Sequence, residues 1–325
     1  MGEGEQVDGS GDLGARARRQ FAVDERTVSA IGPAGELTSP AAERARAWQA
    51  SLPADRGDVI EHLVPRIDRA IQRAQPEFQG RQRGQLDLTS EQIKARVDEL
   101  APWHVPFALG FGRVTVRNAV QAAAYEERLQ FRRDLINGTL VDLLGAELAD
   151  TTALDIGCNC GYFSLDLATR GAAHVDGVDL RPENIAQAQF LAEHFGVDNV
   201  SFHVADAADL GADRQWDVVL NLGLLYHVTE PFELVRQTYE LCRRAAIIDT
   251  VCTREPISAF FTQMDRDVSS HAEGRAPVEL HPTYRAVIDT IHHAGFSEVF
   301  ELTGHCADPH PSYAKATRRC FLGIR

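Results

Sequence analysis

The stretch that decides the fold is Leu154-Asp155-Ile156-Gly157-Cys158-Asn159-Cys160-Gly161-Tyr162-Phe163. Its apolar start is typical of a buried strand, its two glycines are typical of a tight turn, and the residues after them continue as a helix. In open sheets of alternating strands and helices, ligands bind where a strand ends and such a turn begins. The stretch therefore predicts a strand, a ligand-binding turn and a helix in direct succession.

Strand and helix patterns alternate regularly after residue 150, which predicts an α/β fold with a doubly wound, mostly parallel sheet and helices on both faces. One helix is expected to open at Pro182 and end at Gly196, and another to open at Pro282 and end at Gly295. Strands are expected at residues 152–156, 174–178, 200–203, 217–220, 245–250, 297–302 and 319–324.

The chain before this region divides into two parts. Residues 1–38 are rich in small and charged residues with little apolar periodicity, which predicts a disordered tail that adds nothing to the core. Residues 39–118 show helical patterns, including a capping box at Thr89, and are expected to form an N-terminal helical appendage that acts as a lid over the substrate. The main domain is expected to span residues 119–325 and to begin with a helix over 119–144.

Composition excludes several classes of protein. The 325 residues carry a formal charge of −14, with 44 % hydrophobic residues and six cysteines. The negative charge argues against a nucleic-acid partner, and six cysteines are too few for a disulfide scaffold. No apolar run approaches the roughly 20 residues of a membrane span. We therefore expect a cytoplasmic protein with a large core, free thiols and no membrane contact.

The turn residues distinguish between two classes of ligand. A dinucleotide fingerprint would place glycine at positions 157, 159 and 162, whereas Asn159 and Tyr162 stand at the last two. A pyrophosphate could not approach this turn closely. Gly157 and Gly161, preceded by Asp155, fit a ligand with an amino acid and a nucleoside but no phosphate, which describes S-adenosylmethionine. The two cysteines of the turn lack further ligands at a suitable spacing, so no metal site is expected.

Polar residues follow the next three strands. Asp179, with Leu180 beside it, ends the second strand, where a carboxylate can accept hydrogen bonds from ribose hydroxyls. Asp206, followed by Ala207, comes after the third strand and can meet the exocyclic amine of an adenine. Asn221 ends the fourth strand, beside the expected methionine end of the ligand. The predicted cofactor site therefore consists of Asp155, Gly157, Asn159, Gly161, Asp179, Leu180, Asp206, Ala207 and Asn221.

These motifs give residues 134–325 a resemblance to the class I S-adenosylmethionine-dependent methyltransferases, which implies a seven-stranded sheet whose last strand is antiparallel. The run Asn-Leu-Gly-Leu-Leu-Tyr-His at 221–227, together with Pro102-Trp103-His104, resembles more narrowly the wobble-uridine tRNA methyl/carboxymethyltransferase group and its biosynthetic relatives. Carboxymethyl-transferring members carry a lysine just after the Pro-Trp pair. Because His104 and Val105 stand here instead, the resemblance implies unmodified S-adenosylmethionine.

Candidate residues for catalysis lie beyond the fourth strand. A hydroxyl acceptor benefits from a general base, and the ordinary histidine pKa of about 6.5 suits His227 for this role. The alternative is that His227 only shapes the pocket wall. Tyr226 matches the family's tyrosine that faces the transferred group. Trp103 and His104 are expected to contact substrate, although Trp103 can also pack the appendage onto the sheet, and His281 is a weaker candidate base.

The combined interpretation is a methyltransferase acting on a small molecule, by O-methylation of a hydroxyl in a biosynthetic pathway. Two alternatives stay open, a tRNA wobble-uridine methyltransferase and a non-catalytic cofactor-binding module. A tRNA substrate would require a basic surface. The available clusters are Arg128, Arg132, Arg133, Arg243, Arg244, Arg318 and Arg319.

Overall fold

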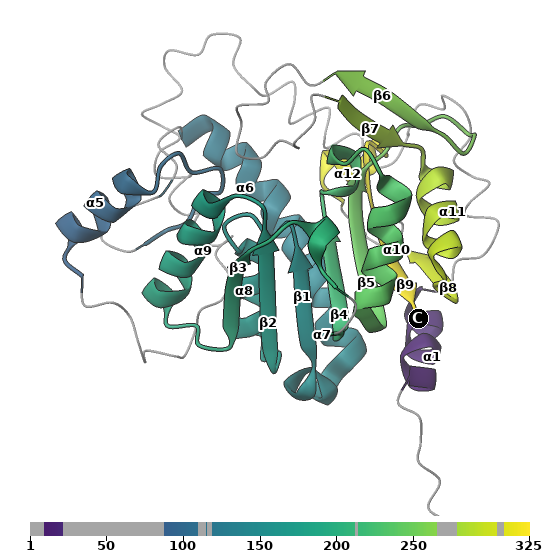
Figure 1. The fold of residues 1–325 in the computed structure, drawn as a ribbon, viewed down its shortest axis with the longest axis horizontal. Helices are drawn as coiled ribbons and strands as arrows, with labels where there is room; N and C mark the ends of the chain where they lie inside the picture. The colour runs from purple at the N-terminus through teal and green to yellow at the C-terminus, as the bar shows by residue number, and fades with distance from the viewer. Residues whose placement is uncertain are drawn as a thin grey trace, which may run out of the picture.

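A seven-stranded sheet forms the centre of the protein (Figure 1). The computed structural model describes residues 10–21, 88–109, 115, 119–211, 214–264, 278–303 and 309–325. The strand order is β3-β2-β1-β4-β5-β9-β8. The strands are β1 (Thr152–Ile156), β2 (His174–Asp179), β3 (Val200–Val204), β4 (Trp216–Leu222), β5 (Cys242–Val251), β8 (Glu298–Glu301) and β9 (Arg318–Ile324).

The pairing of these strands confirms the predicted mostly parallel sheet. Strands β1 to β5 pair in parallel, whereas β9 runs antiparallel between β5 and β8. The chain winds outward from β1 through β2 to β3, then returns to the other side of β1 as β4. Such a reversal leaves a crevice outside the carboxyl ends of β1 and β4, where ligands bind in open α/β sheets.

Helices cover both faces of the sheet. Successive side chains of a strand point to opposite faces, so the strands contribute to two separate hydrophobic cores. Ala153, Val218 and Ile247 belong to the core on the α7 and α8 face, while neighbouring strand residues belong to the core under α10 and α11. Besides α6, described below, the α-helices described in the main domain are α7 (Thr139–Leu144), α8 (Tyr162–Thr169), α9 (Pro182–Phe195), α10 (Pro231–Leu241), α11 (Tyr284–Ala294) and α12 (Pro311–Ala314). Helix α9 begins at Pro182 and is closed by Gly196 in the left-handed conformation, as predicted.

The predicted helix over 119–144 contains a π-helical turn. Helix α6 (Ala119–Arg133) continues through η1 (Asp134–Gly138), five residues of π-helix, into α7. Asn137 in this turn donates its side-chain amide to the Phe163 carbonyl at 3.0 Å and to Asp166 Oδ2 at 2.7 Å. The irregular turn therefore anchors the entry helix to α8, directly after the predicted ligand-binding turn.

The prediction of a disordered tail over residues 1–38 is wrong for α1 (Ser10–Phe21). Leu13 and Ala17, one helical turn apart, are buried in the main core. Arg16 donates to the Leu143 carbonyl at 3.0 Å and pairs with Glu147. The few apolar residues of this helix give no clear periodic signal, and contacts with α7 and β8 contribute to its burial.

Most of the predicted appendage, residues 39–87, lies outside the described residues. Its described part includes α5 (Ser90–Glu99), and the capping box predicted at Thr89 is confirmed, since the Thr89 hydroxyl accepts from the Gln92 amide while Gln92 Oε1 accepts from the Thr89 amide. No helix among the described residues has the length and apolarity that a membrane crossing requires.

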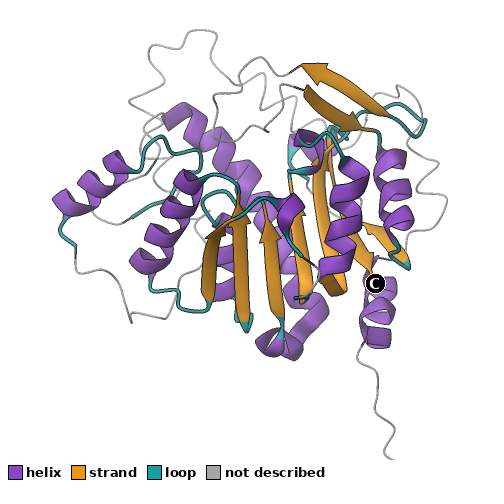
Figure 2. Cartoon of the chain, viewed as in Figure 1, coloured by secondary structure: helices purple, strands orange, loops and turns teal. Residues whose placement is uncertain are grey.

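A two-stranded hairpin, missed from the sequence, lies apart from the central sheet (Figure 2). Strands β6 (Phe260–Met264) and β7 (Val278–Pro282) pair antiparallel. The helix expected to open at Pro282 begins two residues later, because Pro282 still belongs to β7 and Thr283 caps α11 by accepting a hydrogen bond from the Ala286 amide. Helix α11 then ends at Gly295 as predicted.

Candidate active site

Three left-handed residues shape the turn after β1. Gly157, Asn159 and Gly161 have φ angles of +71°, +52° and +80°. Asparagine enters this region more cheaply than most residues with a side chain. The amides of Gly157 and Cys158 both donate to the Val178 carbonyl, at 2.8 and 2.9 Å. The predicted strand-turn-helix unit is confirmed, and β2 holds the turn in place.

Asp179 secures this turn with its carboxylate. Its Oδ2 accepts from the Asn159 amide at 2.9 Å, and its Oδ1 accepts from the Arg181 amide at 2.9 Å and from Asn184 Nδ2 at 3.1 Å. A carboxylate has about four acceptor positions, so three protein donors leave room for a ligand hydroxyl. Asp179 therefore both builds the turn and retains one acceptor position for a ligand.

Gly161 is required by packing as well as by its backbone angle. A Cβ atom added there would lie 2.5 Å from Cζ of Phe202, and one added at Gly177 would lie 2.6 Å from the same ring. These two glycines therefore leave room for the Phe202 side chain of β3, a role that the sequence did not reveal.

The two cysteines of the turn are thiols rather than thiolates. Burial raises the pKa of Cys158 and Cys160, so both stay protonated at neutral pH.

A cavity of about 310 Å³ opens beside the turn. Its wall combines the turn itself with polar residues from α6, β1, β7 and β9 and with Leu222 from β4. The lining residues are His104, Val105, Tyr125, Arg128, Leu129, Arg132, Asp155, Gly157, Cys158, Asn159, Cys160, Tyr162, Phe163, Leu222, Gly223, Tyr226, His227, Glu279 and Arg318. No group of three or more metal-binding side chains occurs in the part of the chain that the structure describes.

Asp155 forms the acidic part of this wall. Burial raises its pKa to about 6, while a hydrogen bond from the Ser164 hydroxyl at 2.6 Å opposes that rise. The carboxylate is therefore ionised at neutral pH but protonated in mildly acidic solution. A buried anion of this kind suits a cationic group such as an ammonium.

Two arginines that share one carboxylate form the basic part of the wall. Arg132 Nη2 lies 2.8 Å from Asp249 Oδ1, and Arg318 Nε and Nη2 each lie 2.6 Å from the same oxygen. The Tyr313 hydroxyl donates to the other oxygen. Burial opposes ionisation of Asp249, but the two arginines outweigh it and lower its pKa. The cluster carries one excess positive charge at the cavity.

Tyr226 and His227 line the cavity from the short helix η4 (Leu225–His227), and their ring centroids are 4.0 Å apart. His227 Nδ1 lies 3.1 Å from Glu279 Oε1. A hydrogen on Nδ1 would not point directly at this oxygen, so the contact is close without having hydrogen-bond geometry. His281 Nε2 lies 2.7 Å from Glu279 Oε2. Both predicted catalytic residues therefore line the cavity, next to a glutamate from an unpredicted strand.

The cavity lining contains a second tyrosine and histidine pair. The Tyr125 hydroxyl lies 2.7 Å from His104 Nε2, and the Arg128 guanidinium sits 4.5 Å from the centroid of the Tyr125 ring. Trp103 does not line the cavity. Its Nε1 donates to the Val97 carbonyl at 2.8 Å and its ring meets Phe190 edge-on, outside the cavity lining. Of the two residues predicted to contact substrate before the main domain, only His104 is placed to do so.

Several predicted cofactor residues lie outside this cavity. Asn221 is completely buried outside the cavity lining, and its side-chain amide donates to Thr238 Oγ1 at 3.3 Å, so its contact with a ligand stays a prediction. Asp206 caps the short helix Ala207–Asp209 by accepting from the Ala208 amide at 3.0 Å. Leu180 and Ala207 are partly exposed near it. These three remain candidates for contacts with the nucleoside end of a ligand.

Arg132, Arg318, Tyr125 and Glu279 line the cavity without having been predicted there. The two arginines were noted only as members of possible basic clusters, and pairing with Asp249 has no local sequence signal. Glu279 lies on β7, which was not expected. Taken together, the reversing sheet, the glycine turn and the acidic strand ends define a protein that binds a nucleoside cofactor lacking a pyrophosphate.

Comparisons with known proteins make this class specific. The family described as "Methyltransferase domain" matches residues 147–274. The ubiquinone biosynthesis O-methyltransferase of Marinobacter nauticus is 30 % identical over 170 residues, which cover 50 % of this chain and 70 % of that protein. The chain belongs to the class I S-adenosylmethionine-dependent methyltransferases.

Two further similarities are informative. The tRNA U34 carboxymethyltransferase of Wolinella succinogenes is 26 % identical over 159 residues, 48 % of this chain and 55 % of that protein. The N-terminal domain of EvdMO1, in a crystal structure with SAH and D-fucose, is 21 % identical, has a TM-score of 0.56, and covers 74 % of this chain and 97 % of that one. The chain spans about half the length of the first curated relatives that it matches.

Proposed function

We propose that this protein transfers a methyl group from S-adenosylmethionine to a hydroxyl oxygen of a small molecule in a biosynthetic pathway. The observation that carries the proposal is that His227 and Tyr226 line the same cavity as Asp155 and the glycine turn. The similarity to ubiquinone biosynthesis O-methyltransferases supports oxygen as the acceptor atom.

The cavity has the chemistry that this cofactor needs. The amino-acid end of S-adenosylmethionine carries both an ammonium and a carboxylate, and the lining offers both signs of charge, with Asp155 as an anion and Arg132 and Arg318 as cations. Gly157 lines the cavity without a side chain, and its φ of +71° is one that residues with a side chain rarely adopt. Asp179 retains an acceptor position for a ribose hydroxyl.

In this reaction the protein's residues remove a proton and position the reactants. Bound S-adenosylmethionine supplies a methyl group on a cationic sulfur, which a nucleophile attacks in line. His227 takes the proton of the acceptor hydroxyl, and a positioned base of this kind contributes typically 10² to 10⁴-fold. Tyr226 packs against the His227 ring and restricts its orientation. The wall also excludes water and aligns the acceptor.

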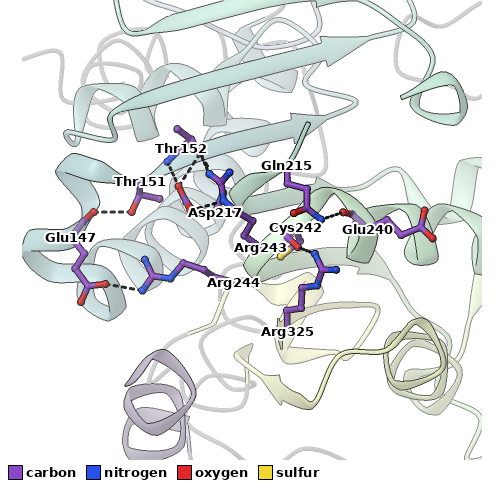
Figure 3. A network of polar contacts seen from close by, with 10 residues as sticks. All are labelled: Glu147, Thr151, Thr152, Gln215, Asp217, Glu240, Cys242, Arg243, Arg244 and Arg325. Atoms are coloured by element: carbon purple, nitrogen blue, oxygen red, sulfur yellow. Dashed lines mark hydrogen bonds and ion pairs between the residues drawn. The ribbon is translucent and has the colours of Figure 1, made fainter. Parts of the chain in front are cut away.

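A tRNA acceptor is the second candidate, favoured by the similarity to a tRNA U34 carboxymethyltransferase. The arginine clusters argue against it. Arg132 and Arg318 are buried against Asp249. Arg243 and Arg244, at the start of β5, pair with Asp217 on β4 and with Glu147, respectively, as Figure 3 shows. Each of these guanidinium groups is held against a carboxylate of the protein, and those of Arg132, Arg318 and Arg244 are largely buried. They therefore do not form the exposed basic surface that a phosphate backbone requires.

The remaining arginines of these clusters also contact groups within the protein. Arg133 is buried beside Asp134, and Arg319 is buried beside Glu301. Arg128 stacks on the ring of Tyr125 in the cavity wall. An acidic protein whose arginines are paired internally favours a small acceptor over tRNA.

The test supplies the protein with methyl-labelled S-adenosylmethionine and three acceptor sets, namely phenols, sugars and bulk tRNA. We expect label in a small hydroxylated molecule and a large loss of turnover in H227Q with unchanged affinity for S-adenosylhomocysteine. Label in tRNA, with binding that weakens steeply with salt, would establish the second candidate. Binding of S-adenosylhomocysteine without transfer to any set would support the non-catalytic module.

A further inference from the structure

One carboxylate bridges two histidines beside the cavity. Glu279 places Oε1 3.1 Å from His227 Nδ1 and Oε2 2.7 Å from His281 Nε2. All three side chains are largely screened from solvent, with exposed fractions of 10 % for His227, 12 % for Glu279 and 17 % for His281. Electrostatic effects between such groups are stronger than between exposed ones.

The hairpin delivers this carboxylate to the cavity. Glu279 and His281 are two residues apart on β7, so their side chains leave the same face of the strand. Strand β7 packs against η4, which carries His227, and β6 pairs with β7 opposite both positions, Gln263 with Glu279 and Phe261 with His281. The arrangement therefore depends on a tertiary contact between two segments about 50 residues apart.

We infer that Glu279 is the positioning residue that makes His227 a base, and that His281 holds Glu279 in place. The carboxylate favours the imidazolium form of His227. In the neutral ring it also favours the tautomer with hydrogen on Nδ1, which leaves the lone pair on Nε2. The Nδ1 and Oε1 atoms are already within hydrogen-bonding distance at 3.1 Å, so a small reorientation of the Glu279 carboxylate and the imidazole is what the hydrogen bond requires.

The inference rests on the proposed function for the proton that His227 takes. As the bond from the acceptor oxygen to carbon forms, the O–H bond breaks and its proton moves to Nε2, while sulfur keeps the electron pair of the bond that it loses. His227 then carries a positive charge next to the negative charge of Glu279. The pair becomes neutral overall, so no isolated charge is created in a water-poor site.

Other charged groups line the same cavity as His227, where Asp155 favours a cation and Arg132 disfavours one. Arg318 on β9 lines the same cavity, and its positive charge disfavours a second cation. Asp249 offsets part of that charge from behind the cavity wall. Glu279 is therefore the carboxylate in direct contact with His227 that can stabilise the imidazolium form.

The test measures the protonation of His227 directly, without any acceptor. Protein labelled with ¹³C in its histidine rings is titrated by NMR, and H227Q identifies the His227 signal. In E279Q we expect the midpoint of this titration to move to lower pH by about one pH unit, a tenfold loss of proton affinity. The matched control E255Q removes one negative charge from an exposed position before the same hairpin and should leave the midpoint in place.

A second variant keeps the test decisive. In H281Q we expect a smaller downward shift, because Glu279 loses one of its two partners. Thermal melts of each variant establish that the protein is folded. A His227 midpoint in folded E279Q within about 0.3 pH units of the wild type would overturn the inference.

Cofactor binding separates this inference from the proposed function. If S-adenosylhomocysteine fails to bind the wild type, the proposed function fails, yet the titration still decides whether Glu279 controls His227. If the cofactor binds and an acceptor is found, the acidic limb of the pH dependence of kcat should move to lower pH in E279Q. An unmoved limb would contradict the positioning role.

Discussion

The raised pKa of Asp155 predicts that the affinity for the cofactor depends on pH. Burial raises the pKa of this carboxyl from 3.8 to about 6. About nine in ten molecules are therefore ionised at pH 7, and only about one in ten at pH 5. If the carboxylate holds the ammonium of the cofactor, the affinity for S-adenosylhomocysteine should fall about tenfold between these pH values. Isothermal titration calorimetry at half-unit steps measures this directly.

Matched variants test the cause. In D155N the affinity should be lower at pH 7 and nearly independent of pH, whereas D289N, at an exposed position of α11, should behave as the wild type. In S164A, loss of the hydrogen bond to Asp155 should move the midpoint to higher pH. A wild-type affinity that is flat from pH 5 to pH 7 would refute the assignment of Asp155 to the ammonium.

The same pKa has a consequence for stability without ligand. Because the folded state binds this proton more tightly than the unfolded state, stability falls as the pH rises from about 4 to 6. A rise of about two pKa units corresponds to a penalty of about 3 kcal/mol at neutral pH. D155N should therefore be more stable than the wild type at pH 7, and should lose this advantage near pH 4. Urea unfolding at both pH values checks the sign.

Two further substitutions test the architecture of the site. D249N leaves Arg132 and Arg318 buried without their shared carboxylate and should lower the free energy of unfolding by about 3 to 5 kcal/mol; a loss below about 1 kcal/mol in urea would contradict the buried cluster. G161A forces a side chain into a left-handed position and against the Phe202 ring, and should cost about 2 to 4 kcal/mol. F202L in the same chain should recover part of this loss, so simply additive losses in the double variant would argue against the contact.

The central sheet could be predicted from the sequence because its signals are local. The run from Leu154 to Phe163 contains its own strand, turn and helix start, and proline and glycine mark both ends of α9. Periodicity over five to fifteen residues reports which face of an element is buried. Element boundaries were less secure, as the start of α11 at Tyr284 shows.

Residues of the site were predictable where they follow a strand. Asp155, Gly157 and Asn159 come at the end of β1, and Tyr226 and His227 come shortly after β4. Parallel strands bring their carboxyl ends to one edge, so position along the chain suffices to bring such residues together. Asn221 is an exception to this pattern. It lies within β4, and its side chain points into the core, where it donates to Thr238.

Only the tertiary structure decided which distant residues meet. Arg132 and Arg318 are separated by most of the main domain, yet both contact Asp249. Glu279 reaches His227 because β7 packs against η4, and α1 is buried because α7 and β8 lie beside it. Pairing of this kind depends on the three-dimensional packing of separate segments. It leaves no periodic pattern in the sequence, whereas the alternation of strands and helices does.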